Sequence, residues 1–378
     1  MQHVGPCCPA SLPAQGQTGQ TSRAEFLSTV SPHDKPWDLH RFQTEQVASI
    51  FEDGLPHHQR QAARMGECSK ILEFGWLLDP ATGVLDFKLK GARFCRVRCC
   101  PTCQWRRSLM WVARFNRAFP RIYQDHPEMR YILLTLTVRN CSVLDLRDTV
   151  KAMNYAWDKL TRRKVWPALG FVRSLEITRG KDGSAHPHFH VVLAVPPGYF
   201  GGKYLSTAKW ASLWQAVLGV DYTPIVDVRI VKPKKLEHLR RTSPLGVDEV
   251  MMDETRAAIT NPQHFNENGG CSSYDPWHEA FQPKPWEVLL AGITEVIKYA
   301  VKPSDMVVDP AWLLDLADQL RKLRAVAVGG IFRKYLAEDE PEDFVTENED
   351  ERRENPGGLH FGWREDPRHA KYARKQPA

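Results

Sequence analysis

The chain lacks a long apolar run, a recognisable secretory leader and an internal repeat. A bilayer-spanning helix needs about 18 consecutive apolar residues, and no segment of the 378 residues reaches that length. The first residues also lack a basic stretch followed by an apolar one, so we expect a cytoplasmic protein with no membrane partner. These absences favour a globular protein, and the chain is long enough to bury a substantial core.

An excess of charge of one sign is also absent, because the net charge is only +6. The charges are nevertheless unevenly distributed: residues 88–121 are rich in Arg and Lys, whereas residues 338–354 are strongly acidic. A basic block within the body of a protein indicates a polyanionic partner. An acidic segment near the end is typical of a solvated tail or linker.

Paired cysteines are not expected, because the nine cysteines are an odd number and four of them lie within nine residues. In a chain without a leader this clustering favours metal ligation over disulfides. A structural Zn²⁺ site is predicted with four thiolate ligands. The predicted ligands are Cys68, Cys95, Cys100 and Cys103, with Cys99 as an alternative to its neighbour. Reduced cysteines in a core are the other interpretation.

Arginines and tryptophans surround these cysteines. Guanidinium groups contact phosphates and indole rings stack on bases, so this stretch predicts a DNA-contact surface. The candidate residues are Arg96, Arg98, Trp105, Arg106 and Arg107. A solvated Arg-rich helix is the alternative.

Composition and periodicity divide the chain into four parts. Residues 1–45 are rich in Gly, Gln, Ser, Thr and Pro, and we expect them to be disordered. A Cys- and Arg-rich module is predicted over 64–121, and a larger domain over 128–330. That domain contains a polar insertion of little order at 233–285, and residues 338–378 are predicted to form a polar tail.

The larger domain has a readable order of elements. Alternating apolar residues predict strands, and apolar residues at helical spacing predict helices. The strands are expected over 131–138, 171–178, 188–195 and 225–231, and the helices over 146–160 and 210–217. This β-α-β-β-α-β order predicts an α+β fold, the split βαβ arrangement with an antiparallel sheet backed by helices. Further helices are expected over 286–302 and 311–327.

Three histidines alternate in the run His186-Pro-His-Phe-His190. Side chains two apart in a strand share a face, so His188 and His190 stand side by side. If the preceding hairpin loop is centred on Asp182, antiparallel pairing puts Glu176 opposite His188 on the same face. Two imidazoles and a carboxylate suit a catalytic divalent ion such as Mg²⁺ or Mn²⁺. Hydrogen-bonded strand histidines and an ordinary exposed carboxylate are the alternative.

A second polar group is predicted on the helix before Pro303. Residues i, i+3, i+4 and i+7 share a helix face, which brings together Glu295, Lys298, Tyr299 and Lys302. A phenol flanked by cations is suited to attack a phosphodiester, because the cations favour the phenolate and hold phosphate oxygens. A surface helix with charge pairs is the alternative.

Together these segments resemble the replication initiators (Rep proteins) of rolling-circle plasmids, in the HUH endonuclease superfamily. The run Tyr131-Ile-Leu-Leu-Thr-Leu-Thr137 is similar to the first family motif, and His186-Pro-His-Phe-His190 to the metal-binding motif. Glu295-Val-Ile-Lys-Tyr299 resembles the catalytic motif of the single-tyrosine branch. The stretch from Cys95 to Arg107 resembles the same branch, and the likeness extends over about 65–330.

The resemblance implies a metal-dependent, site-specific nickase and strand transferase, an HUH nuclease domain preceded by a zinc-type module. It implies that His188 and His190 bind the metal and that Tyr299 becomes linked to the 5′-phosphate. Glu295 would serve as the base for water in termination, and Lys298 or Lys302 would offset charge. The implied partners are single-stranded and hairpin origin DNA together with the host helicase and polymerase.

Three alternatives stay open from the sequence. A relaxase or a transposase uses the same chemistry on a different DNA target. A zinc-module protein that only binds DNA would share the cysteines and arginines. A hydrolytic zinc enzyme is a weaker match, because Val-Val-Leu follows His190 where such sites usually add Asp and His.

Overall fold

The computed structural model of the chain describes residues 25–78, 85–231, 292, 296–297, 300–336, 358–364 and 370–375. Within these residues no helix is both long and apolar enough to cross a bilayer. The helices are α1 (Leu27–Val30), α2 (Pro36–Glu52), α3 (Pro56–Gly66), α4 (Pro101–Asp125), α5 (Leu146–Thr161), α6 (Thr207–Leu218), α11 (Pro303–Val307), α12 (Pro310–Gln319) and α13 (Phe332–Tyr335). The strands are β1 (Ile71–Leu78), β2 (Leu85–Ala92), β3 (Arg130–Thr137), β4 (Gly170–Arg179), β5 (Ala185–Val195), β6 (Val226–Ile230), β7 (Val326–Gly330), β8 (Leu359–Arg364) and β9 (Lys371–Arg374).

A five-stranded antiparallel sheet with the order β6-β3-β5-β4-β7 forms the larger half of the protein. Its first four strands in sequence, β3 to β6, are the four that the sequence predicts. Helices α5 and α6 fall where the periodicity places them. The predicted α+β fold, an antiparallel sheet backed by helices, is therefore confirmed.

The hairpin between β4 and β5 sets the register of this sheet. Gly183 adopts a left-handed backbone (φ 81°) in the turn, and the Gly180 N–H donates to the Ser184 carbonyl at 2.8 Å. Gly tolerates this conformation because it has no Cβ. The register that follows pairs Glu176 with His188, which confirms the predicted alignment.

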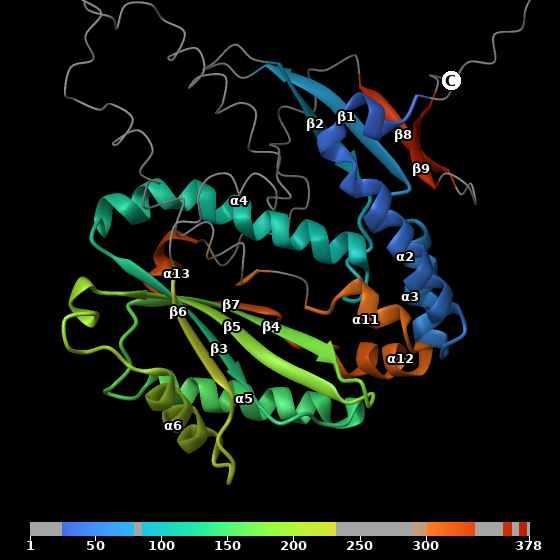
Figure 1. Cartoon of the computed structure of the whole chain (residues 1–378). Helices are drawn as coiled ribbons and strands as arrows, with labels where there is room; N and C mark the ends of the chain where they lie inside the picture. The colour runs from blue at the N-terminus through green and yellow to red at the C-terminus, as the bar shows by residue number, and fades with distance from the viewer. Residues whose placement is uncertain are drawn as a thin grey trace, which may run out of the picture.

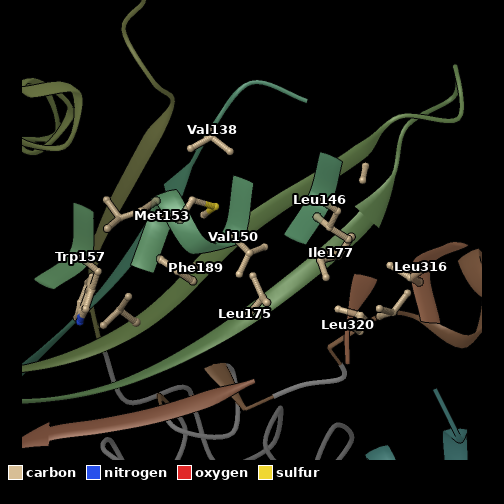
Figure 2. Close-up of a cluster of buried hydrophobic side chains, with 14 of the residues drawn as sticks. Val138, Leu146, Val150, Met153, Trp157, Leu175, Ile177, Phe189, Leu316 and Leu320 are labelled. Carbon is tan, nitrogen blue, oxygen red and sulfur yellow. The ribbon is translucent and has the colours of Figure 1, made fainter. Parts of the chain in front are cut away.

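Helices cover both faces of the sheet (Figure 1). Helices α5 and α6 lie on one face, and Figure 2 shows Val150, Met153 and Trp157 of α5 against Leu175 and Phe189 of the sheet. Helix α4 crosses the other face. There, three of its apolar side chains pack on the alternate residues of β4 and β5, whose side chains point away from α5. These three side chains are Phe115, Phe119 and Ile122.

A second sheet with the order β2-β1-β8-β9 builds a smaller module together with α2 and α3. Two strands of this sheet come from the end of the chain. Tyr372 in β9 is fully buried, and its hydroxyl donates to the Ser69 carbonyl at 2.6 Å. The backbone of Phe26 forms a bridge with Ala373, so the described beginning and end of the chain lie side by side.

Two predictions about the ends of the chain are therefore wrong for the described residues. The predicted disordered segment 1–45 is too long, because α2 begins at Pro36 and buries Trp37 against Trp105 and Tyr372. The polar tail 338–378 contains β8 and β9, whose apolar residues pack on the β1–β2 hairpin. Both ends of the chain are ordered because their apolar residues pack with each other and with β1, β2 and α4 in one core.

The helix predicted over 311–327 ends early. Helix α12 stops at Gln319, Lys322 has a left-handed backbone (φ 61°), and residues from Val326 onward form β7 at the edge of β4. A lysine with positive φ interrupts the helix, and the Val-Ala-Val run suits a strand. The polar insertion 233–285 lies outside the described residues, as do residues 1–24 and the acidic segment at 338–354.

The assignment of the C-terminal strand to the small module predicts a large cost for removing Tyr372. Tyr372→Ala deletes a buried ring and its hydrogen bonds to Ser69, and we expect the free energy of unfolding to fall by about 3–5 kcal/mol. Tyr155→Ala is the control, since Tyr155 is 64% exposed and its loss should cost less than about 0.5 kcal/mol. Urea denaturation measures both, and equal stabilities would contradict the assignment.

Candidate functional site

A cluster of one carboxylate and two imidazoles lies on the face of the large sheet that α4 crosses. The Glu176 Oε2 atom is 2.8 Å from His190 Nε2 and 3.5 Å from His188 Nε2. Glu176 and His188 are buried, and His190 is partly exposed. The three ligand atoms lie within 4.8 Å of one another, close enough to bind one ion.

Hydrogen bonds on the other ring nitrogens orient the two imidazoles. The His188 Nδ1 atom is 3.2 Å from the His186 carbonyl, and the His190 Nδ1 atom is 3.2 Å from Thr135 Oγ1. A ring that donates from Nδ1 keeps its Nε2 lone pair free for a metal, which is the usual arrangement around ligating histidines. Both Nε2 atoms face Glu176. The donor set therefore fits a divalent cation with open positions.

The environment of Glu176 keeps this carboxylate ionised. Burial by itself would raise its pKa, but hydrogen bonds and charge interactions with His188 and His190 outweigh burial, and the pKa lies well below 4.5. A buried carboxylate that stays charged is a ready oxygen ligand for a cation.

His186 lies beside this cluster without joining it. Its Nδ1 atom is 2.7 Å from Asn140 Oδ1, and its ring centroid is 5.2 Å from that of His188. The group that could hold a metal consists of Glu176, His188 and His190. The structure thus brings together the three ligands that the sequence predicts.

The predicted nucleophile and two of its neighbours, Tyr299, Glu295 and Lys298, lie outside the described residues. Described residues before and after Tyr299 contact β4. The Ser174 hydroxyl donates to the Val296 carbonyl, and the Ile177 N–H donates to the Ala300 carbonyl at 2.8 Å.

Lys302 does not belong to the predicted helix face. Residues 300–302 are not helical, since Val301 forms a parallel bridge with Ile177 and Lys302 has extended backbone (φ −66°, ψ 134°) before α11. The prediction of a helix reaching Lys302 is therefore wrong. Pro303 explains the difference, because a proline pushes the preceding residue out of the α region and starts a helix readily.

Four cysteines form a second cluster, at the junction of α3, the β2–α4 loop and α4. The Sγ atoms of Cys68 and Cys95 each lie 3.6 Å from that of Cys103, and those of Cys68 and Cys100 are 3.7 Å apart. A disulfide would need about 2.0 Å, whereas four thiolates at about 2.3 Å from one Zn²⁺ are about 3.8 Å apart. All four side chains are buried. The donor set and its spacing fit tetrahedral zinc.

Backbone N–H groups surround these sulfur atoms. The N–H of Cys95 points to Cys68 Sγ at 3.4 Å, and that of Arg96 points to Cys103 Sγ at 3.3 Å. Burial raises the pKa of the Cys100 thiol, but hydrogen bonds from Cys103, Cys68 and Cys95 lower it well below 9.0 overall. Cys100, and not Cys99, faces the other three. The Cys99 side chain is buried but is not one of the four converging ligands, and burial raises its pKa to about 12.

The candidate DNA-contact residues divide into three groups. Trp105 is buried, lies edge-on to Trp37 at 4.8 Å and stacks on His40 at 4.6 Å, so its ring is not available to bases. This part of the prediction is wrong, because Trp105 occupies the face of α4 that packs on the small sheet. Arg96 is exposed, and the Arg106 guanidinium lies 5.2 Å from the Trp37 ring. The remaining two, Arg98 and Arg107, line one pocket.

Sequence reasoning missed three polar residues at these sites. Thr135 binds His190 from the neighbouring strand, and Ser174 bonds to the segment that precedes Tyr299. The Gln104 Oε1 atom accepts from the Val301 N–H at 3.3 Å. The alternation of Thr135 with Thr137 in β3 indicates that both side chains share one face of the sheet. This pattern could point to a contact with His190 only once β3 is known to pair with β5.

A third group of His and Asp side chains joins α3 to α12. His57 Nε2 lies 2.7 Å from Asp318 Oδ1, and His58 Nε2 lies 3.4 Å from the same oxygen. The Leu55 N–H donates to His58 Nδ1 at 3.3 Å, so the proton of a neutral His58 ring sits on Nε2 and faces Asp318. The ligand atoms of His57, His58 and Asp318 also lie within 4.8 Å of one another, and their contacts connect α3 to α12.

The fold and these sites define a class: an α+β protein whose antiparallel sheet carries a His–carboxylate cluster and whose second module carries four convergent cysteines. A family model described as "Replication protein" matches residues 86–373, which is most of the chain. The chain belongs to this replication protein family. The expectation of a replication initiator (Rep) protein is thereby confirmed.

Several curated relatives carry the name "Protein rep". The chain is 37% identical over 235 residues to that of Bacillus amyloliquefaciens, covering 60% of this chain and 67% of the relative. It is 42% identical over 210 residues to that of Lactiplantibacillus plantarum, covering 53% and 62%. It is 41% identical over 184 residues to that of a Bacillus species, covering 48% and 58%. The matches thus span about three fifths of these relatives' length, and no solved structure matches the chain.

The cysteine geometry predicts one tightly bound zinc per chain. Cys100→Ser removes one of four converging ligands, so we expect the zinc to be lost and the melting temperature to fall, because structural zinc contributes directly to folding. Cys99→Ser is the matched control, because this side chain is also buried but is not one of the four converging ligands. Native mass spectrometry counts the metal, and zinc retained by the Cys100 variant would refute the assignment.

The His–carboxylate cluster of Glu176, His188 and His190 predicts a site for Mn²⁺ that is separate from the zinc. His190→Ala should abolish Mn²⁺ binding, whereas His186→Ala should leave it nearly unchanged, because His186 bonds to Asn140 instead. Thr135→Val removes the hydrogen bond that orients His190 and should weaken affinity by roughly 10–100-fold. Mn²⁺ titration followed by electron paramagnetic resonance gives the three affinities. Equal losses in the two histidine variants would contradict the ligand set.

Proposed function

We propose that this protein initiates rolling-circle replication of a plasmid by nicking one strand of the origin through a covalent tyrosine intermediate. One observation carries the proposal. The described residues that flank Tyr299 in sequence, Val296 and Ala300, bond to β4 at Ser174 and Ile177, on either side of Glu176. In a chain of the replication protein family, this supports a nucleophile beside the His–carboxylate cluster.

The residues then take distinct roles. The Tyr299 oxygen attacks the scissile phosphorus, a phosphotyrosine ester forms, and the bond to the 3′ oxygen breaks to leave a 3′-hydroxyl. A host polymerase extends that hydroxyl behind a host helicase, in the cytoplasm. Lys298 offsets charge on the phosphate, and Glu295 activates the water that later releases the phenol. The ester preserves the bond energy for strand joining at termination.

Three side chains prepare the site for the phosphate. Glu176, His188 and His190 would hold a divalent ion such as Mg²⁺ or Mn²⁺, which when bound polarises a phosphate oxygen as a Lewis acid. Thr135 keeps the His190 ring in the orientation that this requires. Glu176 is buried, so few water molecules reach this carboxylate.

The four-cysteine module has a structural role in this proposal. Cys68, Cys95, Cys100 and Cys103 would hold Zn²⁺ and fix the start of α4 against α2 and α3. Thr44 of α2 bonds to Thr102 of α4 at 2.9 Å next to Cys100. The module thereby anchors the helix that crosses the nuclease face.

The nucleophile assignment predicts the outcome of one substitution. Tyr299→Phe should abolish the covalent protein–DNA adduct on single-stranded origin DNA with Mn²⁺, because the attacking oxygen is absent. Tyr204→Phe, at an exposed position, is the control and should form the adduct at the wild-type rate. Denaturing gel electrophoresis of labelled DNA measures the adduct. An adduct in the Tyr299 variant, or none in the wild type, would overturn the proposal.

A further inference from the structure

We propose that Gln104, in the first turn of α4, is a positioning residue for the nucleophile: its side chain holds the chain just after Tyr299 against the nuclease sheet. The inference deepens the proposed function and rests on it for the role of Tyr299. It gives the cysteine module a part in the reaction, because Gln104 directly follows Cys103 of the thiol cluster.

The first observation is the bond that Gln104 makes to the chain two residues after Tyr299. The Gln104 Oε1 atom accepts from the Val301 N–H at 3.3 Å, and both residues are buried. The bridge between Val301 and β4 uses a different group, the Ala300 carbonyl, which accepts from the Ile177 N–H at 2.8 Å. A buried backbone N–H needs a partner, and Gln104 supplies the one for Val301.

The second observation is the place of this bond relative to the His–carboxylate cluster. Ile177 directly follows Glu176 in β4, and the carbonyl that Ile177 binds belongs to Ala300. Ala300 is the covalent neighbour of Tyr299. Consecutive Cα atoms are about 3.8 Å apart, so a displacement at Val301 is passed to Tyr299 within two residues. A misplacement of about 1 Å can slow a reaction about 100-fold, which makes the nucleophile sensitive to this contact.

The third observation is that the first turn of α4 is held firmly. The Gln104 N–H donates to the Cys100 carbonyl at 2.9 Å. The hydroxyl of Thr102 lies 2.9 Å from that of Thr44 in α2. The Gln104 Nε2 atom lies 4.0 Å from Met306 Sδ, so both ends of the amide have a partner. A side chain that is already ordered can hold the segment without a further loss of rotamer entropy.

The sheet supplies the corresponding bond before Tyr299. The Ser174 hydroxyl of β4 donates to the Val296 carbonyl, and Ser174 is buried. Gln104, Ser174 and Ala300 line the same pocket between α4 and β4. The segment is therefore held from two directions, by β4 and by Gln104 of α4.

The test compares two substitutions of Gln104 in the full-length protein. Gln104→Met keeps the length of the side chain but removes the acceptor, whereas Gln104→Glu keeps an acceptor oxygen. At saturating single-stranded origin DNA and Mn²⁺, we expect single-turnover adduct formation to slow roughly 10–100-fold in the Met variant. The Glu variant should stay close to the wild-type rate. Gln104→Asn, whose acceptor is one methylene shorter, replaces the Met variant if that variant does not fold.

Two further measurements distinguish positioning from loss of binding. Mn²⁺ affinity, from electron paramagnetic resonance, should match wild type in both variants, because Gln104 is not among the three ligands of the His–carboxylate cluster. Hydrogen exchange followed by mass spectrometry needs no DNA. Peptides that contain the Val301 amide should exchange faster in Gln104→Met and at the wild-type rate in Gln104→Glu, because only the first variant lacks an acceptor.

Gln319→Met is the matched control for a purely structural effect. The Gln319 Oε1 atom likewise accepts from a backbone N–H, that of Arg147 at 3.2 Å, but this bond joins α12 to α5. Its loss leaves a backbone donor without an acceptor, as in Gln104→Met, and should lower the melting temperature by a similar amount. The rate of adduct formation should nevertheless stay at the wild-type value.

Several outcomes would overturn the inference. These are a wild-type rate in Gln104→Met, equal slowing in the Met and Glu variants, equal slowing in Gln319→Met, or slowing without faster exchange at Val301. If wild type forms no adduct, the proposed function fails and the role of Gln104 fails with it. If wild type forms the adduct, Tyr299→Phe does not and Gln104→Met matches wild type, only the inference about Gln104 fails.

Discussion

The antiparallel register of β4 and β5 is the constraint on which the site depends. The turn at Gly183 aligns Glu176 with His188, and the period of two then places His190 on the same face. A slip of one residue would move the carboxylate to the α5 side, into the apolar core. That side is filled by large apolar side chains such as Phe189. Burial of these apolar residues therefore stabilises the register in which Glu176, His188 and His190 share the other face.

Helix α4 is the element that connects the two halves of the protein. Its first turn carries Cys103 of the thiol cluster, and its middle and end pack on the large sheet through Phe115 and Phe119. Between these two parts its side chains line the pocket next to Ser174. A change that loosens the cysteines would therefore shift residues near the His–carboxylate cluster, although the two clusters share no ligand.

Four of the five strands of the large sheet could be predicted, because β3 to β6 each show a clear alternation of apolar residues; β7, which was expected as part of a helix, could not. The ends of the chain could not. Trp37 and Tyr372 stabilise each other across most of the sequence, and neither neighbourhood has enough apolar residues to indicate order by itself. The prediction for Trp105 is wrong for a similar reason. An indole beside arginines suits both base stacking and a core, and only its neighbours decide between the two.

The sequence by itself determined which side chains share a face of a strand, because the period of two is a property of the backbone. It therefore placed His188 and His190 on one face, and with a hairpin centred on Asp182 it predicted that Glu176 pairs with His188. The cysteine spacing predicted the four thiolates, apart from the ambiguity at Cys99 and Cys100. Only the tertiary structure resolved that ambiguity, because the Cys100 sulfur, and not that of Cys99, lies with the other three. It also decided that Lys302 leaves the predicted helix and that the arginines of one module face the sheet of the other. Contacts between distant segments set these features, and no local pattern encodes such contacts.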